Sequence, residues 1–216
     1  MNVAAATKQD HTIHVDRDES WRFIRAAKFA ADHASTDNGR PILNAIEISI
    51  TKDNPAMVQL VATDSYRLAV VECSFITQDS LDARDDVSVA VDAKQLASAL
   101  PTKSKIHEYG LRLIIGPDGV TINNETTVHL PNVEGVYPNW KSLLTPWTEN
   151  VRGHEAFAVN PQLMGKIMTS FHRVRDRSDT PVTILTGQSP LKPIGMECNL
   201  ELLDVRSLLM PVRIAS

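Results

Sequence analysis

Apolar positions change from strand-like alternation to helical spacing and back at three places along the chain. The first place begins with alternation over residues 12–15, and apolar side chains then recur every three or four positions over residues 20–34. This pattern predicts a strand followed by an amphipathic helix, with Asp18 as the N-cap of the helix. Further strands are predicted over residues 42–50, 58–63 and 67–75.

The second place follows a charged loop and begins near residue 87. A strand is predicted over residues 87–91, and Asp92 is the expected N-cap of a short helix that Pro101 closes. Turn residues then separate three strand patterns, over residues 111–115, 120–122 and 126–130.

The third place begins near residue 155, with a strand over residues 156–159. Asn160 is the expected cap of the next helix, and Pro161 stands at its first position, where proline is favoured. Strands are predicted over residues 182–185, 194–198 and 208–214. The apolar face of the helix consists of Leu163, Met164, Ile167, Met168 and Phe171.

The chain therefore consists of three successive units, each with one strand, one helix and about three further strands. The helices are expected to cover one face of largely antiparallel sheets, which is an α+β fold. A repeat length near 70 residues is too long for the common solenoid repeats.

The composition is that of an ordinary globular protein, with 43% hydrophobic and 22% charged residues. The net charge of −4 means that any contact with nucleic acid must come from a local basic surface on an acidic body. Cys73 and Cys198 lack the spacing of a zinc site and are expected to be buried thiols. The sequence has neither a signal peptide nor a membrane-spanning run, so we expect a cytoplasmic protein.

The sequence contains none of the common catalytic motifs, such as a Walker loop, GxGxxG, HExxH or GxSxG. Asp85 and Asp86 lie in a charged loop and are expected to be solvated. Asp64 has no second acidic group near it in sequence. We therefore expect no enzymatic activity, no cofactor and no metal site.

Three stretches occur in a characteristic order: VATDSYRLAV over residues 61–70, VEGVYPNWK over 133–141 and LLMPVRI over 208–214. They resemble the motifs ATDGHRLA, GRFPDYRR and VVMPMRL of the β subunit of bacterial DNA polymerase III, the sliding clamp. RPILN over residues 40–44 is similar to a clamp segment after the first helix of a domain.

The resemblance implies a domain organisation based on the clamp fold of repeated βαβββ units. Residues 1–10 are expected to be a flexible tail, and residues 11–132 resemble the complete middle domain of a clamp, with two units. Residues 133–150 resemble the linker between domains, and residues 151–216 resemble the second half of the last domain.

The resemblance also implies a cleft that binds an extended peptide with hydrophobic anchors. Here Ser65 replaces the family's glycine, Tyr66 its histidine and Ser142 its second arginine. Without the resemblance, the same segments are an ordinary hairpin and an ordinary strand. The matching positions are Thr63, Ser65, Tyr66, Arg67, Leu68, Pro138, Leu143, Leu208, Met210, Pro211, Val212 and Arg213.

In clamps the helices point basic side chains at the DNA backbone, which gives contacts that are sensitive to salt and independent of base sequence. A solvated helix face is the alternative interpretation of such positions. The candidate DNA-facing residues are Arg22, Arg25, Lys28, Lys94, Lys103, Lys105, Lys166, Arg173, Arg175 and Arg177.

The predicted function is that of a clamp or processivity factor, which encircles duplex DNA and tethers DNA polymerase and other replication proteins. A clamp loader is a further possible partner. The alternative is a non-encircling adaptor or decoy that binds or sequesters clamp-binding proteins. The apolar helix face of the third unit is expected to be exposed in a monomer, which favours a homo-oligomer. With three units per chain, a tetrameric ring is favoured over an open dimer.

Overall fold

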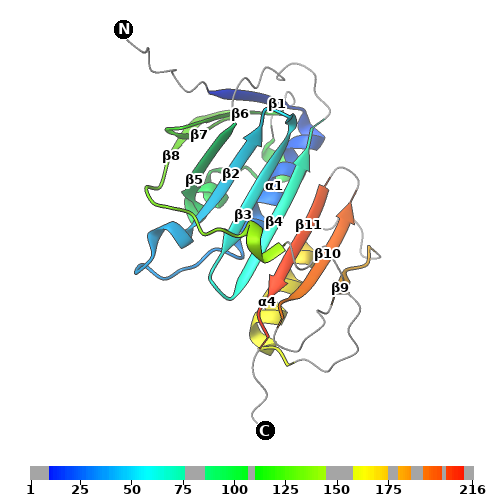
Figure 1. The fold of residues 1–216 in the computed structure, drawn as a ribbon. Coiled ribbons are helices and arrows are strands. Elements are labelled where there is room, and N and C mark those ends of the chain that lie inside the picture. The colour runs from blue at the N-terminus through cyan, green and yellow to red at the C-terminus, as the bar shows by residue number, and fades with distance from the viewer. Residues whose placement is uncertain are drawn as a thin grey trace.

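The computed structural model describes residues 10–75, 86–106, 110–144, 158–174, 180–185, 192–200 and 203–211. Their strands form two antiparallel sheets (Figure 1). The four-stranded sheet has the order β1 (His11–Val15), β6 (Leu111–Gly116), β7 (Gly119–Asn123) and β8 (Thr127–Pro131). The seven-stranded sheet has the order β5 (Val87–Asp92), β2 (Ala45–Thr51), β3 (Asn54–Thr63), β4 (Arg67–Ser74), β11 (Leu203–Leu209), β10 (Ile194–Leu200) and β9 (Thr183–Leu185).

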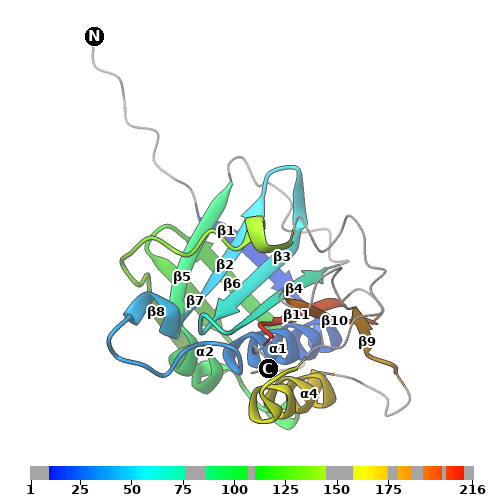
Figure 2. The same ribbon diagram turned by 60° about the horizontal axis from the view of Figure 1, so that its bottom comes forward.

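Three helices lie on the same side of the seven-stranded sheet: α1 (Arg17–Ala31), α2 (Ala93–Ala99) and α4 (Pro161–Val174) (Figure 2). This arrangement confirms the predicted α+β fold. Below, the side of the sheet that carries the helices is called the helix face, and the opposite side is called the outer face. No helix within the described ranges is long and apolar enough to cross a bilayer.

The first two units exchange their first strands. β1 pairs with β6 of the second unit, and β5 pairs with β2 of the first unit. The third unit is attached differently, because its last strand, β11, pairs along its whole length with β4. The seven-stranded sheet is therefore continuous from the first unit into the third.

Helix starts follow local capping chemistry. The prediction of Asp18 as the first cap is wrong by two residues, because Asp16 accepts a hydrogen bond from the Glu19 amide at 2.8 Å and α1 begins at Arg17. The other two caps are confirmed. Asp92 accepts from the Gln95 amide at 2.7 Å, and Asn160 accepts from the amides of Gln162 and Leu163.

Two predicted strands have other bounds in the structure. Pro41–Asn44 forms a 3-10 turn (η1), so β2 begins at Ala45 and not at residue 42. The last strand was predicted over residues 208–214, whereas β11 spans Leu203–Leu209. Pro211 has no amide hydrogen to continue the strand, and residues 212–214 lie outside the described residues. Of the strand predicted over 156–159, only the last two residues are described.

The main core joins both sheets and the three helices. Phe29 of α1 meets Phe171 of α4 edge-on, with ring centroids 5.0 Å apart. Ile167 and Phe171 are fully buried, and only Met168 of the predicted apolar face is substantially exposed, at 38%. The expectation that this face is exposed in a monomer is therefore wrong, because α4 packs against α1 of the same chain.

Cys73 and Cys198 are buried thiols, as predicted. Burial raises the pKa of the Cys73 thiol to about 12, so this group stays protonated near neutral pH.

Candidate functional site

The pairing of β4 with β11, called the junction below, brings together segments that are more than a hundred residues apart in sequence. Leu68 lies opposite Leu208, and Arg67 lies opposite Leu209. Beyond the strand, the Met210 amide donates a hydrogen bond to the Tyr66 carbonyl at 3.1 Å. Both strand segments of the predicted cleft therefore lie side by side.

A tight turn over residues 63–67 shapes one end of the junction. The Asp64 carboxylate accepts hydrogen bonds from the amides of Tyr66 (3.0 Å) and Arg67 (2.7 Å), and the Thr63 hydroxyl donates to the Arg67 carbonyl at 2.7 Å. Ser65 has a φ of 75°, in the region that favours glycine, which is the residue at the matching position of the clamp motif that this segment resembles. The turn directs Tyr66 into solvent, where 64% of it is exposed.

Strand alternation divides the predicted cleft residues between the two faces of the sheet. Thr63, Leu68 and Leu208 belong to the outer face. There Leu68 and Leu208 form a small second core with Val61, Val70 and Trp140. Arg67 follows the opposite parity and lies on the helix face. The predicted cleft residues are thus not all brought together on one surface.

The segment 133–144 crosses the outer face (Figure 1) and is held there by two aromatic residues. The Trp140 indole donates to the Glu47 carboxylate at 2.8 Å, and the Tyr137 hydroxyl donates to the Val61 carbonyl at 3.0 Å. Burial raises the pKa of Tyr137 far above its usual value. Sequence reasoning did not assign these residues a role, although two aromatics in a predicted linker are a signal of docking.

Four apolar residues of the predicted cleft are exposed, and one of them, Tyr66, also lines the hollow on the helix face described below. Tyr66, Leu143 and Met210 are 64%, 47% and 41% exposed, and Pro138 is also exposed. We call these four residues the rim. Pro211 is half-buried, whereas Val212 and Arg213 lie outside the described residues.

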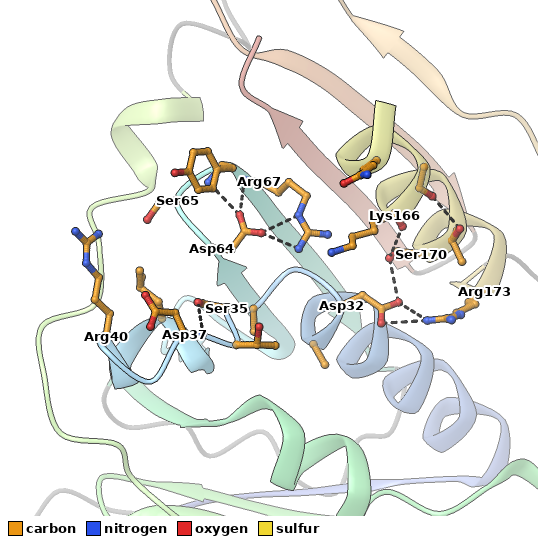
Figure 3. A pocket seen from close by; sticks show the side chains of 18 residues that line it. Asp32, Ser35, Asp37, Arg40, Asp64, Ser65, Arg67, Lys166, Ser170 and Arg173 are labelled. Atoms are coloured by element: carbon orange, nitrogen blue, oxygen red, sulfur yellow. Dashed lines mark hydrogen bonds and ion pairs between the residues drawn. The ribbon is translucent and has the colours of Figure 1, made fainter. Parts of the chain in front are cut away.

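On the helix face, the junction borders a hollow of about 1160 Å³. Its walls are the end of α1, the turn over residues 63–67 and one side of α4 (Figure 3). Arg67 is 5% exposed there, and its Nε and Nη2 donate to Asp64 at 2.9 and 2.7 Å. Arg173 pairs with Asp32 at 2.8 Å, and the Ser170 hydroxyl donates to the same carboxylate.

The candidate DNA-facing cations differ in their accessibility. Arg25 is a correction: it is 8% exposed and donates to the Val174 carbonyl at 2.7 Å, so it joins α1 to α4 and does not face solvent. Arg22 and Lys28 are half-buried. Arg175 and Arg177 lie outside the described residues. The exposed candidates are Lys94, Lys103, Lys105, Lys166 and Arg173.

His33 joins α1 to β11 and was not singled out from sequence. Its ring nitrogens lie 3.0 Å from the Phe29 carbonyl and 2.9 Å from the Ser207 hydroxyl. Complete burial is the main reason that its pKa is lowered to about 4. Within the described ranges, no group of three or more His, Cys, Asp or Glu side chains is placed to hold a metal ion.

The family model of the DNA polymerase III beta subunit, central domain, matches residues 14–139. No curated protein matches the sequence.

Several solved structures share the fold at low sequence identity. The Helicobacter pylori beta clamp in complex with diflunisal is 13% identical, with a TM-score of 0.73 over 99% of this chain and 69% of that chain. The Thermotoga maritima DNA polymerase III beta subunit is 14% identical, with a TM-score of 0.70 over 100% of this chain and 68% of that one. The sliding clamp from Bacillus subtilis is also 14% identical, with a TM-score of 0.68 over 99% and 67% of the two chains.

Proposed function

Because this chain belongs to the family of bacterial DNA polymerase III beta subunits, we propose that it is a sliding clamp that tethers replication proteins to duplex DNA. The observation that carries the proposal is that the two faces of one sheet carry different kinds of side chain. The outer face carries the apolar cluster of Leu68 and Leu208, whereas the helix face presents exposed cations. Members of the clamp family are not enzymes, and we propose the same for this chain.

The outer face has the chemistry to hold a peptide with hydrophobic anchors. One Leu or Phe side chain of a partner, buried against Leu68 and Leu208, contributes about 1.5–3 kcal/mol. Met210 has an unbranched side chain that adapts to anchors of different shape. DNA polymerase and other replication proteins that carry such peptides are the proposed partners, with a clamp loader among them.

The helix face has the chemistry to contact the DNA backbone without reading its sequence. Lys94, Lys103 and Lys105 are exposed around α2, and Lys166 and Arg173 are exposed on α4. Such contacts release counterions and weaken steeply as salt increases. A clamp that slides needs only contacts of this kind.

We further propose that copies of the chain associate into a ring. In the first two units, an exchanged strand completes each sheet, as β5 does beside β2. β9 forms the outer edge of the seven-stranded sheet, and Ile184 on it is 48% exposed. Reciprocal pairing of two copies at this edge would be isologous. Bacterial clamp rings resemble twelve such units around a hole, and with three units per chain that number corresponds to four chains.

The alternative function is a non-encircling adaptor or decoy that uses only the outer face. One observation favours it: the apolar side of α4 packs inside the chain, so that face does not require a partner. The two functions share peptide binding and differ in assembly and DNA binding.

Light scattering coupled to size-exclusion chromatography separates these functions, with binding of a labelled duplex followed at several salt concentrations. A mass near four times 23.9 kDa and a salt-sensitive DNA affinity are the results expected of a clamp. A monomer that does not bind duplex DNA at low salt would overturn the clamp and leave the adaptor or decoy.

A further inference from the structure

The Arg67 guanidinium is only partly satisfied by its surroundings. Its side chain is 5% exposed, and Nε and Nη2 donate to Asp64. Its Nη1 is buried and has no hydrogen-bond partner among the described residues. Buried donors are nearly always paired in folded proteins, and one left unpaired is unfavourable. The site is therefore short of a hydrogen-bond acceptor.

A second cation converges on the same place. Lys166 extends from α4 across the hollow toward the Arg67 guanidinium (Figure 3). Lys166 forms no ion pair with another residue of the described ranges. Two like charges that point toward each other repel unless an anion lies between them. The arrangement therefore calls for a negatively charged acceptor.

The carboxylates that line the hollow do not fill this role. Asp64 is engaged by Arg67, and Asp32 is engaged by Arg173 and Ser170. Asp37 lies on the far side of the hollow beside Arg40 (Figure 3), where its carboxylate accepts from the Gly39 amide. The space between Arg67 and Lys166 is thus lined by donors, beside an opening large enough for a polyatomic anion.

We propose that Arg67 and Lys166 form a seat for one backbone phosphate of duplex DNA. The inference rests on the proposed DNA-binding role and adds a defined contact to it. One phosphate oxygen would accept from Arg67 Nη1 and another from the Lys166 ammonium, which is charge-assisted pairing. Arg67 is thereby moved from the peptide cleft to the DNA side of the molecule.

The position of the hollow favours phosphate over an acidic peptide. It lies on the helix face, together with the exposed cation Arg173. Leu68 and Leu208 lie across the sheet from it, although Tyr66 of the rim also borders the hollow. A peptide anchored on the outer face would have to wrap around the turn over residues 63–67 to reach Nη1.

The test measures the affinity of the full chain for a fluorescein-labelled duplex of roughly 30 base pairs by anisotropy, across a series of salt concentrations. The variants are Lys166→Gln, which removes one charge, and Arg67→Lys, which keeps the charge next to Asp64 and removes Nη1. Lys52→Gln is the matched control, because Lys52 is exposed in the β2–β3 turn and does not line the hollow. Thermal melts establish that each variant is folded.

Lys166→Gln is expected to lower the slope of log K against log salt by about 0.9, the loss of one phosphate contact. Arg67→Lys is expected to weaken binding about tenfold, and Lys52→Gln to leave binding unchanged. Wild-type affinity and slope in folded Lys166→Gln would overturn the phosphate seat while leaving the DNA role intact. Lack of duplex binding by the wild type would overturn both. If Arg67→Lys weakened only the binding of an acidic clamp-binding peptide, Arg67 would serve the peptide and the proposal would be wrong.

Discussion

At the scale of single residues, successive side chains of a strand point to opposite faces of the sheet, and this alternation decides which binding partner each can contact. Arg67 and Leu68 are neighbours in sequence, yet Leu68 packs under Trp140 on the outer face and Arg67 lies in the hollow on the helix face. Ser65 shows the same local dependence, because its φ of 75° follows from the turn and not from its own preference. One motif therefore supplies residues to two different surfaces.

We expect the buried His33 to make the free energy of unfolding depend on pH. Its pKa is about 4 in the folded protein, against 6.5 for an ordinary histidine, so the unfolded chain binds the proton more readily between these values. The contribution to stability is fully present above pH 6.5 and is lost as pH falls toward 4. The total loss from this residue is about 3 kcal/mol.

Urea unfolding at intervals between pH 4 and 7 checks this prediction. His33→Gln is expected to flatten the dependence between pH 5 and 6.5, whereas His172→Gln, at an exposed position of α4, is expected to retain it. The same pH dependence in wild type and His33→Gln would show that another group is responsible.

At the scale of secondary-structure elements, α4 and α1 hold the third unit against the first. Phe171 is fully buried against Phe29, Arg25 donates to the last turn of α4, and His33 reaches Ser207 of β11. These contacts supplement the backbone pairing of β4 with β11. The third unit is thus held by packing on one face of the sheet and by strand pairing at its edge.

Phe171→Ala is expected to destabilise the protein by about 3–5 kcal/mol, because it leaves a cavity between the two helices. Hydrogen exchange should show the loss of protection first in α4 and β9–β11, and later in β1 and β6–β8. Met168→Ala on the same helix is the control, because Met168 is 38% exposed and should change stability by less than about 1 kcal/mol. A uniform loss of protection in Phe171→Ala would show instead that all three units unfold together.

At the scale of the whole molecule, one continuous sheet separates two binding surfaces. The outer face carries the apolar cluster of Leu68 and Leu208, and the helix face presents the hollow and the exposed cations. Because side chains are packed on both faces of the sheet, truncating a surface side chain on one face should cause little structural change on the other face. Effects of surface variants on the two proposed activities should therefore be separable.

Met210→Ala is expected to weaken binding of a labelled peptide with two hydrophobic anchors about tenfold, since part of one anchor contact is lost. Its affinity for duplex DNA should not change, whereas Lys166→Gln should show the reverse pattern. Val136→Ala is the matched control for peptide binding, because Val136 is 93% exposed and lies outside the rim. Peptide binding that is unaffected by Met210→Ala would remove the rim from the proposed site.

The sequence by itself determined the features that depend on near neighbours. The caps at Asp92 and Asn160, the α+β class and the succession of most strands along the chain follow from local hydrogen bonding and apolar periodicity. The motif over residues 61–70 also indicated the family that the sequence comparison shows. These signals reside within a few residues of one another, so the sequence displays them directly.

Only the tertiary structure decided how distant segments meet. The pairing of β11 with β4 sets Leu208 opposite Leu68 and places Arg67 beside α4, and the packing of α4 on α1 buries Phe171 and Arg25. The residue pattern of an apolar helix face is the same whether the face packs against another copy or against its own chain. That outcome depends on which long-range contacts bury the most surface, and local sequence patterns do not encode it.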